Sequence, residues 1–139
     1  MTEPNEQYAY FTVAGDFDPG DVSELAGLAP TECWSKGDVN PRTLMERKCS
    51  RWSLYSRLER TQSLEDHIAD VIEQLGAGKP GFVKVCTEHG GGGMQLVAYF
   101  RTGYPGLHFD RGLIESLAKY GLSVDFDFYY WYSDRREDS

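Results

Sequence analysis

The chain contains the same pattern twice, a short aromatic run followed by the start of a helix. Ala-Tyr-Phe at residues 9–11 precedes Phe-Asp at residues 17–18, and Ala-Tyr-Phe at residues 98–100 precedes Phe-Asp at residues 109–110. In each copy the aspartate is suited to cap a helix, and the apolar residues after it are spaced to form one helix face. The repeat therefore predicts two related strand–helix units. The alternative is a coincidence, because Phe-Asp is a common start of a helix. The repeat carries no chemistry of its own.

Length and charge limit the classes of function. A chain of 139 residues predicts one domain, and its net charge of −8 disfavours binding to nucleic acids or to anionic membranes. The same charge would suit a basic protein partner. No apolar run approaches the length needed to span a bilayer, and the polar, acidic N-terminus does not resemble a secretory signal. We therefore expect a cytoplasmic protein.

Residues that could carry catalysis or bind metal are few and widely spaced. The three cysteines, Cys33, Cys49 and Cys86, are an odd number without a Cys-x-x-Cys motif, which predicts reduced thiols. The three histidines lack the spacing of metal ligands, and no nucleophile motif is present. We therefore expect neither a metal site nor another cofactor, and we favour a protein without enzymatic activity.

Hydrophobic patterns and capping residues define the elements of the chain. Strands are predicted at residues 8–14, 51–57, 82–89, 94–101 and 122–131, and helices at residues 19–26, 63–75 and 110–120. The four glycines at residues 90–93 are interpreted as a hairpin loop between two of these strands. In the last strand, apolar residues alternate with Asp125 and Asp127, which indicates that one face of the sheet is wet or lines a groove.

The resulting order, β-α-β-α-β-β-α-β, predicts an α+β fold. We expect a two-layer sandwich in which helices cover one face of a mainly antiparallel five-stranded sheet, as in a relative of the ferredoxin-like fold. The helix at 63–75 would then be an insertion. The predicted organisation is a flexible N-terminus (1–7), a single domain (8–132) and a charged C-terminal tail (133–139).

The segment at residues 31–50 is polar and rich in basic residues, and we interpret it as a long exposed loop. Long loops without regular structure are uncommon and are often functional. The loop, the strand after it and the end of the last predicted strand supply a cluster of aromatic and basic side chains. This cluster predicts a binding groove formed by Trp34, Lys36, Arg51, Trp52, Tyr55 and Trp131. The alternative is that the tryptophans close the edges of a small core.

Several motifs spread over nearly the whole chain resemble one family of small bacterial proteins, the family of domain of unknown function 4279. They are Tyr10-Phe11, residues 15–19 (Gly-Asp-Phe-Asp-Pro), residues 25–31, residues 34–38, residues 52–54, residues 66–68, residues 105–108 and residues 122–127. The resemblance implies a bacterial, single-domain, non-secreted protein, and it implies no activity. Some similar small acidic proteins act as immunity partners of toxins, which is an association only.

These observations favour a non-enzymatic binding module, of the immunity or adaptor type, that binds another protein such as a basic toxin. Small size, acidity, exposed aromatic residues and the absence of a catalytic motif support this interpretation. The alternative is a small-molecule binding protein, or a minor enzyme, that uses the aromatic and basic groove. A pocket with convergent polar groups would favour the alternative.

Overall fold

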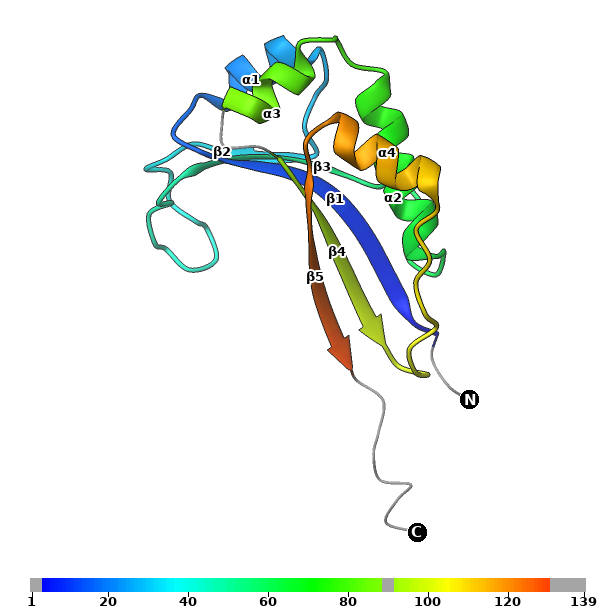
Figure 1. The fold of residues 1–139 in the computed structure, drawn as a ribbon. Helices are drawn as coiled ribbons and strands as arrows, with labels where there is room; N and C mark the ends of the chain where they lie inside the picture. Colours follow the sequence, from blue (N-terminus) through cyan, green and yellow to red (C-terminus); the bar gives the residue numbers. More distant parts are fainter. Residues whose placement is uncertain (1–3, 89–91, 131–139) are drawn as a thin grey trace.

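The computed structural model describes residues 4–88 and 92–130, which form a two-layer α+β sandwich (Figure 1). The elements in chain order are β1 (Glu6–Gly15), α1 (Pro19–Ala26), β2 (Glu32–Trp34), β3 (Ser50–Tyr55), α2 (Leu64–Gly76), α3 (Phe82–Glu88), β4 (Gly93–Phe100), α4 (Arg111–Lys119) and β5 (Ser123–Tyr130). Strand β1 takes in Glu6 and Gln7, which the sequence pattern assigned to the flexible N-terminus. Within the described ranges, no helix combines the length and the hydrophobicity that a membrane crossing needs.

The strands form one mixed sheet in the order β2-β3-β1-β4-β5. Neighbouring strands are antiparallel except β4 and β5, which are parallel and are connected through α4. The predicted α+β sandwich with a mainly antiparallel five-stranded sheet is therefore confirmed. The ferredoxin-like relationship is not confirmed, because one strand on which it depended is a helix.

The four helices of the described residues lie on the same face of the sheet, and the core lies between the two layers (Figure 1). Side chains alternate along β1, so Ala9, Phe11 and Val13 are buried beneath the helices while Tyr8 and Tyr10 point to the other face. The sheet and the helices contribute the following fully buried large side chains: Phe11, Val13, Trp52, Met94, Leu96, Phe100, Val22, Ile68, Val71, Leu75 and Phe82.

The prediction of a strand at residues 82–89 is wrong, since Phe82–Glu88 is the helix α3. Phe82 and Cys86 are four residues apart and both are buried, whereas Lys84 is exposed. A strand would have placed all three on one face, and a helix separates Lys84 from the other two. The predicted hairpin at 90–93 is therefore also wrong, because a helix precedes β4; residues 89–91 lie outside the described part of the chain.

The segment at 31–50 is not a continuous loop, because it contains the edge strand β2. The strand has only three residues and pairs with β3, with Cys33 opposite Trp52. Beyond it, an isolated bridge joins Val39 to Glu46, and the backbone N–H of Gly37 donates to the Arg47 carbonyl. A three-residue strand is too short to produce a recognisable alternation in the sequence.

The repeated Ala-Tyr-Phe patterns form β1 and β4, the neighbouring strands at the centre of the sheet. In both copies the alanine and the phenylalanine are buried, and the predicted caps of the following helices are confirmed: Asp18 accepts from Gly20 and Asp110 accepts from Leu113. The likeness ends there. The helix after β1 leads to the edge strand β2, whereas the helix after β4 leads to β5, which pairs parallel to β4.

Candidate binding surface on the open face of the sheet

The face of the sheet opposite the helices is uncovered in the part of the chain that the structure describes, and we call it the open face (Figure 1). Alternation along the strands places the following residues on it: Tyr8, Tyr10 and Thr12 of β1, Arg51, Ser53 and Tyr55 of β3, Glu32 and Trp34 of β2, Gln95 and Tyr99 of β4, and Asp125, Asp127 and Tyr129 of β5. Aromatic rings and carboxylates therefore dominate a surface that an ordinary solvated sheet would fill with small polar residues.

Three tyrosines form a stack across β1 and β3. The ring centroids of Tyr10 and Tyr55 lie 4.4 Å apart and nearly parallel, and the Tyr8 ring lies 5.9 Å from that of Tyr55. A second stacked pair, Tyr99 and Tyr129, joins β4 to β5 with a centroid distance of 5.1 Å. Burial, reinforced by the charge of Glu32, raises the pKa of Tyr55 to about 12. The Tyr55 hydroxyl therefore stays neutral and acts as a hydrogen-bonding group rather than as a nucleophile.

A hollow of about 400 Å³ lies beside this stack, above β2 and β3. It is lined by Tyr10, Glu32, Trp34, Arg51, Ser53, Tyr55 and Gln95. The guanidinium of Arg47 lies 3.7 Å from the centre of the Trp34 ring, and that of Arg51 lies 5.8 Å from it. Arg51 also donates to the Thr12 hydroxyl at 3.0 Å. The hollow thus combines a fixed cation, a carboxylate and aromatic walls.

The structure brings three of the six predicted site residues together and places two others elsewhere. Trp34, Arg51 and Tyr55 line the hollow. Lys36 lies away from it, with its ammonium 3.7 Å from the Asp16 carboxylate. Trp52 is fully buried on the opposite face of β3, which is where the alternative interpretation, a tryptophan in the core, would place it. Trp131 lies outside the described residues.

Sequence reasoning missed the tyrosines of the central strand. Tyr8 and Tyr10 alternate with buried Ala9 and Phe11, so their period of two already indicated that they face away from the core. The pairing of Tyr10 with Tyr55 could not be read from the sequence, because it depends on the register between β1 and β3. Glu32 was missed because β2 itself was not predicted.

Two groups of residues elsewhere have the side chains of nucleophilic catalysis, but each includes a buried side chain that a substrate cannot reach. Burial raises the pKa of the Cys86 thiol to about 11, so it is not a ready nucleophile. Ser56 Oγ and His67 Nδ1 are 2.6 Å apart, and His67 Nε2 lies 2.9 Å from the Glu59 carbonyl. Because a carbonyl only accepts, Nε2 donates to it and Nδ1 accepts from Ser56. His67 is fully buried, so a substrate cannot reach this pair.

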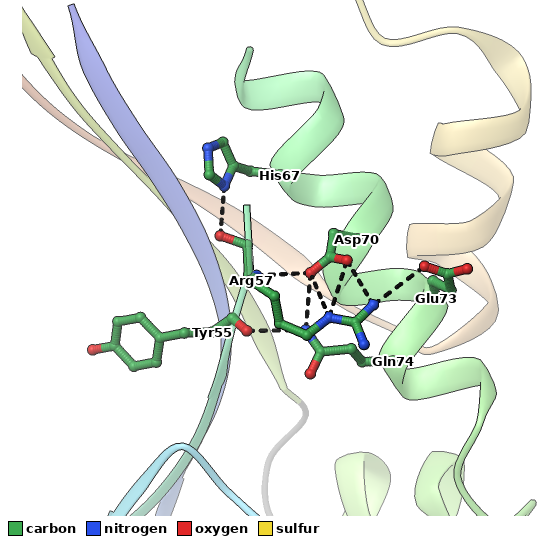
Figure 2. A network of polar contacts seen from close by, with 7 residues as sticks. Tyr55, Arg57, His67, Asp70, Glu73 and Gln74 are labelled. Atoms are coloured by element: carbon green, nitrogen blue, oxygen red, sulfur yellow. Dashed lines mark hydrogen bonds and ion pairs between the residues drawn. The ribbon is translucent and has the colours of Figure 1, made fainter. Parts of the chain in front are cut away.

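The Ser56–His67 pair belongs to a polar network that ties the end of β3 to α2 (Figure 2). Asp70 on α2 accepts from the backbone N–H of Arg57 at 2.8 Å and from its guanidinium at 2.7 Å. Gln74 donates to the Tyr55 carbonyl at 3.0 Å. Burial alone would raise the pKa of Asp70, but the hydrogen bonds from Arg57 outweigh it and lower the pKa. The network is therefore structural: it fixes the strand that presents Tyr55 on the open face.

The burial of His67 predicts how the free energy of unfolding depends on pH. Burial lowers the pKa of His67 below its ordinary value of 6.5, so below that pH the unfolded chain binds a proton more readily than the folded protein. The free energy of unfolding should therefore fall as the pH drops from 7.5 to 5.5, by at most about 1.4 kcal/mol per pH unit from this group. Urea unfolding of His67→Gln, which does not titrate there, should show a smaller fall; equal falls in the two proteins would contradict the assignment.

Among the described residues, no three His, Cys, Asp or Glu side chains lie close enough together to hold a metal ion. The carboxylates of Asp125 and Asp127 on β5 are instead engaged with neighbours, since Gln95 donates to Asp125 at 2.7 Å and a hydrogen bond to Asp127 raises the pKa of Tyr129.

Comparisons with known proteins agree with the resemblance noted in the sequence. A search of curated proteins and a search of solved structures each return no match. A family model, in contrast, matches residues 5–131, which is nearly the whole chain and includes every strand and helix described above. The chain therefore belongs to the family described as Domain of unknown function (DUF4279).

Proposed function

We propose that this protein is a non-enzymatic binding protein that recognises a second protein through the open face of its sheet. The observation that carries the proposal is the stack of Tyr8, Tyr10 and Tyr55 on a face that no described helix covers. Tyrosine gives a large, rigid contact area at a low entropic cost, and it is enriched in protein interfaces. Packing of the core does not require these rings to be stacked on the outer face.

The charges of the open face support a basic partner. Among the open-face residues named above, three carboxylates (Glu32, Asp125 and Asp127) outnumber the one guanidinium, that of Arg51, and the whole chain carries a net charge of −8. Opposite charge on the partner would speed encounter and disfavour acidic competitors. The proposal has two narrower forms, both in a bacterial cytoplasm. In one the protein is an immunity protein that neutralises a toxin, and in the other it is an adaptor that holds a protein by its basic surface.

A paired variant tests the proposed surface. Tyr10→Ala combined with Tyr55→Ala should abolish capture of the partner from an extract of the native host, because it removes the centre of the stack. The melting temperature should change little, since both rings are only half-buried. Leu44→Ala combined with Met45→Ala removes two exposed apolar side chains from the segment between β2 and β3 and should leave capture intact. The proposed surface would be refuted if the unaltered protein and both double variants captured the same proteins.

The hollow beside Trp34 favours a second candidate function, the binding of a small planar or anionic molecule. Arg51 and Glu32 converge there on aromatic walls, and its volume of about 400 Å³ lies in the range of ligand sites. Such a ligand would raise the melting temperature of the unaltered protein and not that of Arg51→Ala. A ligand found in this way, together with no protein partner, would favour this candidate over the first.

A further inference from the structure

In the part of the chain that the structure describes, β5 forms an edge of the sheet. β5 is the last strand of the sheet, and no other described strand pairs with its outer side. Ser123 donates its backbone N–H to the Gly92 carbonyl at 3.2 Å. Because alternate residues bond to the neighbour in a parallel ladder, the N–H and C=O groups of Val124, Phe126 and Phe128 point outward. These three residues of β5 thus present a row of backbone donors and acceptors along its outer side.

Proteins usually block such an edge with proline, with charged side chains, above all lysine, with a bulge or by keeping the strand very short. The sequence of β5, Ser-Val-Asp-Phe-Asp-Phe-Tyr-Tyr, contains neither proline nor lysine. Instead, large aromatic side chains are exposed along it, with Phe126 57% and Tyr130 55% exposed. An exposed aromatic edge of this length is a template on which another chain can pair.

On the helix side of the sheet, the edge borders an apolar groove. The groove has a volume of about 530 Å³ and is lined by Tyr104, Leu107, Phe109, Phe126 and Phe128. All five are hydrophobic, and the Tyr104 side chain is 52% exposed. A strand added to β5 would direct every second side chain into this groove, which therefore requires apolar residues at those positions.

On the open face, the same edge is acidic. Asp125 and Asp127 alternate with the phenylalanines of the groove, and neither β4 nor β5 contains a lysine or an arginine. Side chains of an added strand that face this side would lie beside the two carboxylates, at the distance of cross-strand neighbours. Lysine or arginine is favoured there, and acidic residues are repelled.

We infer that the outer edge of β5 accepts an extended segment of a partner protein in which basic and apolar residues alternate. The inference rests on the proposed protein-binding function and specifies the chemistry of the partner. Backbone hydrogen bonds to Phe126 and Phe128 give affinity, the groove takes the apolar side chains, and the two aspartates select the basic ones. The added strand would extend the open face beyond Tyr129.

A second copy of this chain is a poorer occupant. Antiparallel pairing of two β5 strands about a two-fold axis places residues of the same face opposite each other. In every register centred between residues 125 and 127, aspartate would then lie opposite or diagonal to aspartate of the other copy. Like charges at these positions destabilise a strand pair, so the two aspartates also protect the edge from self-association.

The test uses the full chain and a labelled ten-residue peptide of alternating lysine and valine. The peptide should bind and should slow amide hydrogen exchange of Phe126 and Phe128 at least tenfold. The same sequence with glutamate in place of lysine, or with every peptide nitrogen methylated, should not bind. Asp125→Asn combined with Asp127→Asn should weaken binding at least fivefold, whereas Glu24→Gln combined with Glu115→Gln, an equal change of charge on exposed helix positions, should leave the affinity within twofold.

Several outcomes would overturn the inference. Binding without slower exchange on β5, or equal binding of the methylated peptide, would mean that charge alone attracts the peptide. Slow exchange without peptide would mean that the chain itself covers the edge, and slow exchange that grows with protein concentration would mean that a second copy does. If these results occur while the Tyr10 and Tyr55 variant still loses its partner, the edge inference fails and the proposed function stands.

Discussion

Replacing Trp52 by alanine should lower the free energy of unfolding by about 3–5 kcal/mol. The Trp52 side chain is fully buried, and its ring centroid lies 6.0 Å from those of both Phe11 and Phe82. Its indole N–H donates to the Ser23 hydroxyl on α1 at 2.9 Å. Truncation would therefore leave a cavity where β3, α1 and α3 meet and would also remove a hydrogen bond between the layers. Urea unfolding followed by circular dichroism measures the loss.

Trp34 provides the matched control for Trp52, because it is the same residue type on the opposite side of the sheet. Its ring is partly exposed, and its N–H donates to the Cys49 carbonyl at 3.1 Å. Trp34→Ala should cost at most about 2 kcal/mol, from one hydrogen bond and the contacts with the arginines. If Trp52→Ala lowered the free energy of unfolding by less than about 1 kcal/mol, Trp52 would not be a core residue and would again be a candidate for the binding groove.

The difference between the two tryptophans shows why the sequence identified the site only in part. Composition drew attention to both residues, since tryptophans beside basic residues are typical of binding grooves. The face on which each tryptophan lies depends on which alternate residues of β3 point to the core. Trp52 and Leu54 point inward, and Arg51 and Tyr55 point outward. Trp34 joins the outward group only through the pairing of β2 with β3, which is a long-range contact.

The fold was predictable where local signals agree. Asp18 and Asp110 cap their helices as the sequence indicates, and the strands with an alternating pattern are present. The failure at 82–88 has a local cause, because a seven-residue run of mixed apolar and polar residues fits either a strand or a helix. What decided it was tertiary: Phe82 packs between Phe11 and Tyr120, with ring centroids 4.9 and 6.0 Å away.

The parallel pairing of β5 with β4 was likewise not visible in the sequence, although the alternation of β5 was. Alternation indicates two different faces and says nothing about which neighbour the strand selects. That choice makes β5 the edge of the sheet, places Asp125 opposite Gln95 and leaves Phe126 exposed. The position of β5 at the edge of the sheet therefore depends on topology. The apolar and acidic character of its two faces, in contrast, is visible in the alternation of the sequence.

Replacing Ile68 by alanine tests the two-layer arrangement that holds the open face in place. Ile68 is fully buried on α2, in a helix face that packs on β1 and includes Leu64, Val71 and Leu75. The variant should lose about 2–5 kcal/mol of unfolding free energy, from lost burial and from the cavity that remains. Urea unfolding provides the measurement.

The same substitution at Ile114 controls for the loss of an isoleucine from a helix. Ile114 is 54% exposed on α4, so Ile114→Ala should change the free energy of unfolding by no more than about 0.5 kcal/mol. A change below about 0.5 kcal/mol for Ile68→Ala as well would mean that α2 does not pack on the sheet. In that case the helices could not be assigned to one face of the sheet, and the face that bears the tyrosines could not be called open. Both the proposed function and the inferred binding at β5 depend on that open face.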